Sequence, residues 1–175
     1  MHSILCTIGF TGKTAEEFFR LLQEAGVRTV IDVRENRIGQ LSGFAKAPNL
    51  AFFLERVGGI AYAHAPELAP SPEIRKAYQR SKDWPAYEAA FLQLMRERQI
   101  PERVDPAGYE GTVALLCSEP GPEKCHRRLV AELLAGHWRA QGHTIEIRHL
   151  FTAKVTPKTR KKSTRAAGDD DAPDH

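Results

Sequence analysis

The sequence predicts an α/β fold, with a mostly parallel five-stranded sheet and helices on both of its faces. Five short apolar runs, each long enough for a strand, alternate with segments of helical periodicity. Strands that are joined through helices run parallel, because the chain must cross back before each new strand begins. We assign residues 1–151 to a single α/β domain. Residues 152–175 have no apolar periodicity, so we expect a disordered tail that is first basic and then acidic.

The expected strands are apolar runs that end at glycine, charged residues or polar residues. They are Ile4–Ile8, Thr29–Val33, Ile60–His64, Thr112–Cys117 and Thr144–Leu150. Such runs of four to eight residues, rich in valine, isoleucine and leucine, are typical of strands buried in a parallel sheet. We therefore expect side chains on both faces of the sheet to be covered.

The expected helices begin at recognisable caps. Thr14 and Glu17 form the pattern of a capping box, which predicts a helix from Thr14 through Ala25 with Gly26 just beyond its end. Asp83 has the character of a second N-cap. The other expected helices are Asn49–Val57, Glu73–Arg80, Pro85–Arg98 and Lys124–Gln141. Residues 35–46 and 100–111 are expected to be loops.

Composition excludes several classes of protein. Of the formal charge of +3, the segment 152–175 carries +2, so the preceding residues are almost neutral and do not indicate a nucleic-acid-binding surface. No apolar run is long enough to span a membrane, and the residues after Met1 lead into a strand rather than a secretion signal. Three cysteines do not form a disulfide framework. We expect a cytoplasmic protein with no membrane partner.

Reactive residues are concentrated between Val113 and Arg128, where the sequence is VALLCSEPGPEKCHRR. The pattern indicates a strand that ends at Cys117, a loop containing prolines, and a helix that begins near Cys125. A helix N-terminus attracts anions and favours thiolates. We therefore expect a lowered pKa for Cys125 if it lies in the first helical turn.

Polar residues also follow the other expected strands. In open parallel sheets, ligands bind beyond the carboxyl ends of the strands. We predict that one cleft gathers the residues that follow four strands and the start of the last helix: Gly9, Asp32, Arg34, His64, Glu67, Cys117, Glu119 and Arg127.

Each of these residues also has a purely structural interpretation. Cys117 is of a residue type that is often buried as a small apolar side chain. Asp32 and Arg34 point to the same side of a strand and could form an ion pair, whereas His64 and Glu67 could anchor a loop. Cys117, Cys125 and His126 are of metal-ligating types, but their spacing differs from the short CxxC motif of structural zinc sites, so we predict no metal.

Five segments resemble the domain-of-unknown-function family 488 over residues 4–150. They are TIGFTGKTAEEFFRLL from Thr7, IDVREN from Ile31, GFAK from Gly43, GIAYAHAPEL from Gly59 and LLCSEPGPEKCHRRLVAELL from Leu115. The last is the most specific, with a cysteine at the strand end, a glutamate and then Cys-His-Arg. The resemblance implies an α/β sheet and no defined activity. Many relatives have His or Tyr where this chain has Phe10, so the resemblance implies no proton transfer at that position.

The chain also resembles rhodanese-like domains at Asp32, Arg34, Cys117 and Arg127. In those domains the cysteine begins a tight loop whose N–H groups hold an anion or a persulfide. Here the loop is longer and contains Pro120 and Pro122, each of which lacks an N–H donor. Sulfur transfer is therefore only a hypothesis.

These residues favour a small thiol-dependent enzyme that acts on an anionic ligand or nucleotide. Arg34, Arg127 and Lys46 would bind the anion. Cys117 or Cys125 would be the nucleophile or the redox centre, with the acid or base drawn from Glu119, His64 and His126. The residues do not identify a cofactor.

Two alternatives stay open. In the first, the protein binds nucleic acid or nucleotides through its arginines and the basic segment Lys154–Arg165. In the second, it is a non-catalytic interaction module in which the cysteines and histidines are structural.

Overall fold

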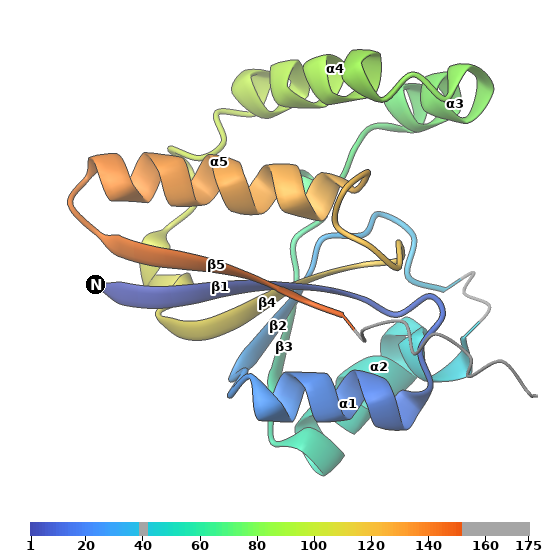
Figure 1. The fold of residues 1–175 in the computed structure, drawn as a ribbon, viewed down its shortest axis with the longest axis vertical. Helices are drawn as coiled ribbons and strands as arrows, with labels where there is room; N and C mark the ends of the chain where they lie inside the picture. The colour runs from blue at the N-terminus through green and yellow to red at the C-terminus, as the bar shows by residue number, and fades with distance from the viewer. Residues whose placement is uncertain (39–41, 152–175) are drawn as a thin grey trace, which may run out of the picture.

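Five parallel strands form one sheet in the order β3-β2-β4-β1-β5 (Figure 1). The strands are β1 (His2–Gly9), β2 (Thr29–Asp32), β3 (Ala61–His64), β4 (Gly111–Cys117) and β5 (Thr144–Leu150). This computed structural model describes residues 1–38 and 42–151. The α/β fold with a parallel five-stranded sheet is therefore confirmed. The expected tail and its basic segment Lys154–Arg165 lie outside the described residues.

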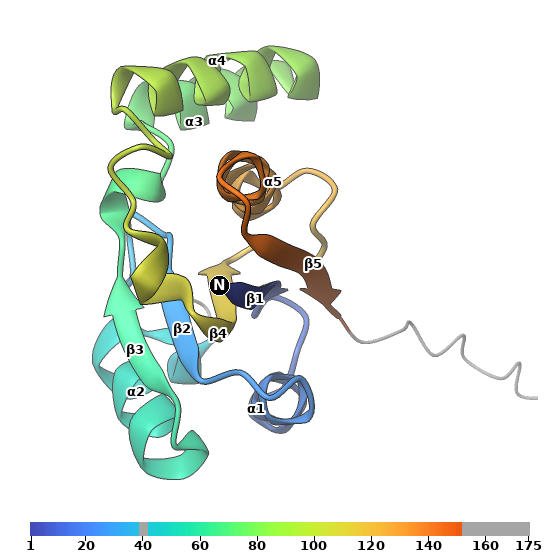
Figure 2. The ribbon, with the colours of Figure 1, turned by 90° about the vertical axis from the view of Figure 1, so that its left-hand side faces the viewer.

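Helices cover both faces of the sheet, as expected (Figure 2). The α-helices are α1 (Ala15–Glu24), α2 (Ala47–Phe53), α3 (Pro72–Ser81), α4 (Trp84–Glu97) and α5 (His126–Ala140). Shorter helical segments are η1 (Gly43–Ala45), η2 (Leu54–Gly58, a π turn), η3 (Pro66–Leu68) and η4 (Pro106–Tyr109). Helices α1 and α2 lie on one face, α5 lies on the other, and the α3–α4 pair lies beyond α5.

The helix caps follow the local sequence closely. Thr14 and Glu17 make the reciprocal capping box at α1, and Asp83 accepts a hydrogen bond from the backbone of Ala86 at α4. Helix α5 begins at His126 rather than Lys124, because Cys125 has an extended backbone with φ −140° and ψ 135°. Cys125 is thus the N-cap residue and not part of the first turn.

The core consists of two layers of apolar side chains, one on each face of the sheet. Alternation along β4 divides them: Val113, Leu115 and Cys117 pack towards α5, whereas Ala114 and Leu116 pack towards α1 and α2. Burial of both faces explains why the strands are continuous apolar runs. The same alternation decides which strand-end residues can meet.

Neighbouring strands β1 and β4 send the chain to opposite faces of the sheet. The chain leaves β1 for α1 on one face and leaves β4 for α5 on the other. In open α/β sheets this arrangement creates a crevice at the carboxyl ends of the two strands. Gly9 and Cys117 are the paired residues at that point.

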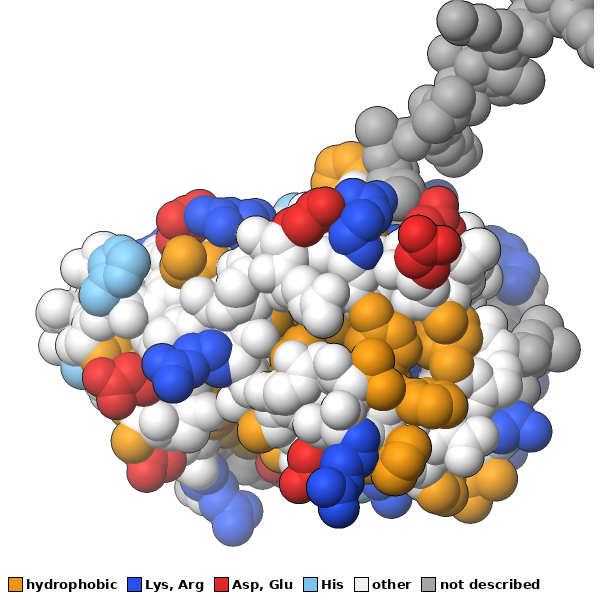
Figure 3. Space-filling model, turned by 90° about the horizontal axis from the view of Figure 1, so that it is seen from below, with side chains coloured by type: hydrophobic (Ala, Val, Ile, Leu, Met, Phe, Trp, Pro, Cys, Tyr) orange, Lys and Arg blue, Asp and Glu red, His pale blue; other side chains and the backbone are white. Residues whose placement is uncertain are grey.

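The face that carries α1 and α2 exposes a group of hydrophobic side chains (Figure 3). Phe52 of α2 and Val57 of η2 are among the exposed large hydrophobic residues of the described chain. None of the described helices combines the length and apolar character needed to cross a membrane.

Candidate functional site

A cysteine and a histidine face each other at the carboxyl edge of the sheet. Cys117 is the last residue of β4, and His126 is the first residue of α5. The Sγ atom of Cys117 lies 3.6 Å from Nδ1 of His126, and both residues are buried. A thiol and an imidazole at this separation can form a hydrogen bond.

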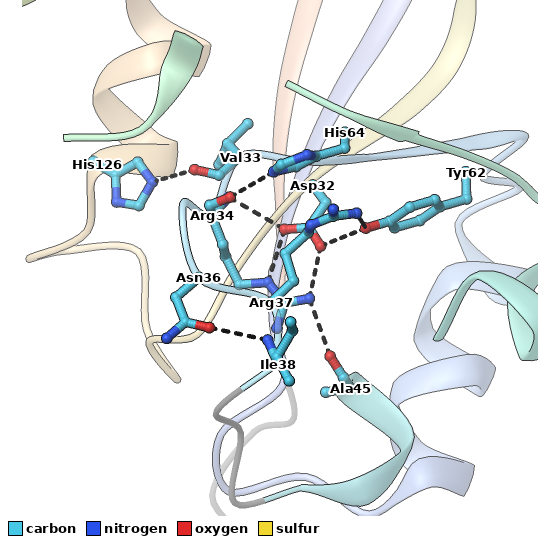
Figure 4. A network of polar contacts seen from close by, with 10 residues as sticks. All are labelled: Asp32, Val33, Arg34, Asn36, Arg37, Ile38, Ala45, Tyr62, His64 and His126. Atoms are coloured by element: carbon cyan, nitrogen blue, oxygen red, sulfur yellow. Dashed lines mark hydrogen bonds and ion pairs between the residues drawn. The ribbon is translucent and has the colours of Figure 1, made fainter. Parts of the chain in front are cut away.

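The other ring nitrogen of His126 is held by the backbone. Nε2 of His126 lies 3.0 Å from the carbonyl oxygen of Val33, just beyond β2 (Figure 4). Because a carbonyl can only accept a hydrogen bond, Nε2 carries a proton and donates it. In the neutral ring Nδ1 is therefore the acceptor, directed at the Cys117 thiol. The backbone thus orients His126 as a base for Cys117.

A second thiol completes the cluster. The Sγ atoms of Cys117 and Cys125 and the nearer nitrogen of His126 all lie within 4.8 Å of one another. The guanidinium of Arg127 donates to Cys125 Sγ at 3.1 Å. His126 thus contacts Cys117, Arg127 donates to Cys125, and the two sulfurs lie within 4.8 Å of each other.

The cluster places its negative charge on Cys117. The hydrogen bond from Cys125 lowers the pKa of Cys117 well below that of an ordinary thiol, against the effect of burial, and the charges on His126 and Arg127 lower it further. Burial and the neighbouring Cys117 raise the pKa of Cys125. The expectation of a lowered pKa at Cys125 is therefore wrong. Two buried thiols cannot both ionise side by side, and Cys117 is the one that faces the histidine.

The charges of the neighbouring groups respond to Cys117. Burial alone would lower the pKa of His126, but the charge on Cys117 and the hydrogen bonds of the ring raise it overall. Partial desolvation and the charge on Cys117 raise the pKa of Glu119. A thiolate–imidazolium pair with a nearby carboxyl group that protonates more readily than usual is suited to nucleophilic chemistry.

Arg127 fastens the loop after β4 to the end of β1. Its guanidinium donates to the carbonyl oxygen of Glu119 at 2.7 Å, and its side chain is buried. Gly9 packs against this carbonyl, and a β-carbon at Gly9 would overlap it. Glycine is therefore required at position 9 for close backbone packing.

Asp32 and Arg34 form a buried ion pair near the end of β2 (Figure 4). Nε and Nη2 of Arg34 contact the two carboxylate oxygens of Asp32 at 2.7 and 2.6 Å, and Nη2 also donates to the carbonyl oxygen of Ala45. The hydroxyl of Tyr62 donates to the same carboxylate. The ion-pair interpretation is confirmed; it occupies Nε and Nη2 of Arg34, whereas the buried Nη1 has no hydrogen-bond partner among the described residues.

His64 anchors the segment that follows β2. Its Nε2 lies 2.8 Å from the carbonyl oxygen of Arg34, one residue beyond the carbonyl that His126 contacts. Two histidines, from β3 and α5, therefore hold consecutive peptide groups. This contact matches the loop-anchor interpretation of His64.

A cavity of about 630 Å³ opens onto the cluster. Cys117, Cys125, His126, Glu119 and Arg34 line it. Its other walls come from the segment after β2, from the α3–α4 region and from the loop between β4 and α5. The residues are Glu35, Asn36, Pro70, Arg75, Tyr78, Gln79, Lys82, Trp84, Tyr87, Ser118 and Lys124. Only a few of the residues predicted for one cleft therefore share it.

The remaining predicted residues lie elsewhere. Gly9, Asp32, His64 and Arg127 support the site from behind and do not line the cavity. Glu67 belongs to a separate cavity of about 610 Å³ beside Arg98. Lys46 is exposed between η1 and α2 and lines neither cavity.

Sequence reasoning missed the aromatic wall of the cavity. Tyr78, Trp84 and Tyr87 contact one another with ring centroids 5.0 to 5.9 Å apart. Tyr87 stacks on Phe91, and the ring of Phe91 contacts the ring of His126. Aromatic residues at the facing ends of the two expected helices were a signal of this wall, but only the packing of α3 against α4 brings it to Cys117. The Val33 carbonyl was not detectable, because it is a backbone group.

Cys117, Cys125 and His126 could also hold a soft metal ion, since thiolates and imidazole are ligands of zinc. Their contacts favour a different interpretation. The cationic guanidinium of Arg127 already donates to Cys125, and a cation beside a sulfur disfavours a second one. We therefore interpret the three residues as a hydrogen-bonded thiol pair with its histidine.

Comparison with known proteins identifies the family of the chain. No curated protein and no solved structure matches it significantly. The likeness to rhodanese-like domains accordingly stays a prediction. A family model, described as domain of unknown function DUF488, matches residues 14–134, which include all three residues of the thiol cluster. The chain therefore belongs to the DUF488 family.

Proposed function

We propose that this protein is a thiol-dependent enzyme in which Cys117 attacks a small anionic substrate. The observation that carries the proposal is the double contact of His126. One ring nitrogen is fixed by the Val33 carbonyl at 3.0 Å, and the other faces Cys117 Sγ at 3.6 Å. A base in a fixed tautomer beside a thiol at the floor of a cavity is the arrangement used to activate a cysteine nucleophile.

The residues of the cluster divide the chemistry among themselves. His126 takes the proton of Cys117 on Nδ1 and can return it to a leaving group. Cys125 and Arg127 stabilise the charge on Cys117 from the other side. Glu119, whose pKa is raised by desolvation and by Cys117, supplies a second proton donor at the cavity wall.

The cavity supports binding of an anion, with lysines rather than Arg127 as its unpaired cations. Arg127 does not line the cavity, Nε and Nη2 of Arg34 contact Asp32, and Arg75 is paired with Glu35. Lys82 and Lys124 line the cavity, and neither forms an ion pair in the described part of the chain. These two ammonium groups, with the uncapped N-terminus of α5, are the groups that an anionic substrate would meet.

The nucleophile is tested by alkylation with iodoacetamide as a function of pH, with the modified residue identified by peptide mapping. We expect Cys117 to react with a midpoint below that of a free thiol, because Cys125, His126 and Arg127 lower its pKa. His126→Gln keeps a donor for the Val33 carbonyl but removes the base, so the midpoint should rise. His64→Gln makes the same change at the Arg34 carbonyl and should leave it unaltered.

Two results would contradict the proposal. One is a midpoint at or above that of a free thiol in the wild-type protein. The other is failure of Cys117 to react when folded, although it reacts after denaturation. Metal analysis and alkylation with and without a chelator serve as a control, because a bound metal would protect both thiols until it is removed.

Anion preference is tested by comparing iodoacetate with the neutral iodoacetamide at Cys117. We expect the ratio of their rates to fall several-fold in the double variant Lys82→Gln/Lys124→Gln, because the lost ammonium groups attract only the charged reagent. Lys76→Gln, an exposed change on α3 outside the cavity, is the matched control. An unchanged ratio would show that these lysines do not select anions.

A further inference from the structure

We propose that Cys125 is the resolving cysteine of a hydroperoxide-reducing cycle, in which it forms a reversible disulfide with Cys117. The proposal rests on the proposed function, because it takes the Cys117 thiolate as the group that attacks first. It goes beyond that function by giving the cluster a redox activity and a second substrate class, a small hydroperoxide.

The placement of the two sulfurs carries the inference. Cys117 ends β4 and Cys125 caps α5, and their Sγ atoms lie within 4.8 Å of each other. Both side chains line the same cavity, yet Cys117 is only 5% and Cys125 only 2% exposed. A small oxidant can therefore reach the pair, while bulky thiols of other proteins are held away.

The segment between the cysteines can adjust to bring the sulfurs together. It contains Gly121 between Pro120 and Pro122 and has no helix or strand of its own. Cys125 itself precedes the first turn of α5, so its backbone is not held by intrahelical hydrogen bonds on both sides. A disulfide needs its sulfurs at about 2.05 Å, so a shift within this loop must close the remaining distance.

The first step oxidises Cys117. Its thiolate attacks one oxygen of the hydroperoxide, so an S–O bond forms and the O–O bond breaks. The leaving oxygen takes the proton from Nδ1 of His126 and departs as water or an alcohol. Cys117 becomes a sulfenic acid, oxidised by two electrons, and the peroxide is reduced by two electrons.

The second step uses Cys125. Its sulfur attacks the sulfur of the Cys117 sulfenic acid, an S–S bond forms, and hydroxide leaves with the proton of the Cys125 thiol as water. Arg127 lies 3.1 Å from Cys125 Sγ, so its positive charge stabilises the thiolate that must form there. Once Cys117 is oxidised and neutral, it no longer opposes ionisation of its neighbour. A small dithiol reduces the disulfide and closes the cycle.

The third cysteine provides an internal reference. Cys6 is fully buried in β1 and packs in the core on the opposite face of the sheet, and burial raises its pKa to about 11. It therefore has neither a neighbouring thiol in the cluster nor access to the cavity. Its thiol should survive conditions that oxidise the other two.

The test treats the full-length reduced protein with one equivalent of hydrogen peroxide, followed by thiol counting and peptide mapping. Of the three free cysteines, only Cys6 should still be a thiol that a labelling reagent detects after denaturation. A Cys117–Cys125 disulfide should appear, and dithiothreitol should reverse it. In Cys125→Ser, dimedone should trap a sulfenic acid on Cys117. In Cys117→Ser, peroxide consumption should be lost, because Cys125 without Cys117 has no thiolate partner to resolve and Cys6 does not line the cavity. Cys6→Ser should behave as the wild type.

The outcomes separate this inference from the proposed function. If Cys117 alkylates with a lowered midpoint but peroxide forms no Cys117–Cys125 disulfide, the nucleophile stands and the resolving role is overturned. Oxidation of wild-type Cys117 to a sulfinic acid while Cys125 stays a thiol would overturn it too. If Cys117 shows no lowered midpoint, the proposed function fails, and a disulfide formed equally fast in His126→Gln would then be oxidation of an ordinary thiol pair.

Discussion

The peptide carbonyl of Glu119 packs directly against Gly9, at the point where β4 and β1 end side by side. The guanidinium of Arg127 donates to this carbonyl at 2.7 Å and also lies close to Gly9. A backbone contact and one buried side chain therefore set the path of the loop that leaves Cys117. Two of the residues that set this path, Gly9 and Arg127, do not line the cavity.

Substitution Gly9→Ala should destabilise the protein by about 1–3 kcal/mol or more, because the new methyl group overlaps a backbone atom that cannot rotate away. Urea unfolding measures the change. Gly136→Ala is the control, since its β-carbon would meet nothing within 4 Å and α5 would gain helix propensity. Equal stability of the two variants would contradict the packing at Gly9.

The two consecutive arginines of α5 should differ in their effect on the thiols. Arg127→Met removes a charge that contacts Cys125 and lowers the pKa of Cys117, so the alkylation midpoint of Cys117 should rise. Arg128→Met should leave it unchanged, because Arg128 pairs with Glu88 and Glu132 instead. Arg127→Lys keeps the charge and should restore part of the shift. Equal midpoints in the two Met variants would show that the charge of Arg127 does not act on the cluster.

Breaking the buried ion pair should be costly. Asp32→Asn leaves the Arg34 guanidinium buried without its carboxylate, and we expect a loss of about 3–5 kcal/mol in the free energy of unfolding. Glu24→Gln, which breaks an exposed pair with Arg20, should cost far less, because solvent screens that pair. Comparable losses in urea unfolding of the two variants would show that the buried pair is not specially stabilising.

Alkaline pH should weaken the fold through Cys6. Burial raises the pKa of Cys6 from an ordinary value of 9.0 to about 11, so the folded state keeps a proton that the unfolded chain loses. The free energy of unfolding should therefore fall as the pH rises between these two values and be unaffected by this group below them.

The contribution of Cys6 is isolated by comparing wild type with Cys6→Ala in urea unfolding at a series of alkaline pH values. Burial also raises the pKa of Tyr87 and Tyr109, so both proteins should lose stability in the same direction. The slope should be smaller in Cys6→Ala. Identical slopes would mean that Cys6 keeps its ordinary pKa in the folded protein.

The order of strands and helices could be predicted from the sequence because it depends on local signals. Apolar runs that are buried on both faces, the capping box at Thr14 and the cap at Asp83 all act within a few residues. The start of α5 was placed too early because Lys124 and Cys125 both fit a helix by composition. The backbone of Cys125 is extended instead, so the helix begins one residue later, at His126.

The sequence by itself determined that reactive groups gather at the carboxyl edge of a parallel sheet, since chain direction places every strand end there. It could not decide which of them meet, because the face on which a strand-end side chain lies depends on register. Asp32 pairs with Leu116, the residue before Cys117 on β4. Because side chains alternate along a strand, Asp32 and Cys117 point to opposite faces of the sheet. Asp32 therefore binds Arg34, which also donates to the carbonyl of Ala45.

Only the tertiary structure decided that the site contains a thiol pair with a directed histidine. The Val33 carbonyl that orients His126 comes from a segment 93 residues away, and the aromatic wall comes from α3 and α4, which pack beyond α5. Contacts between backbone groups and side chains from distant segments leave no pattern in the sequence. They arise from the packing of the helices against the sheet, and that packing turned a group of reactive residues into an oriented site.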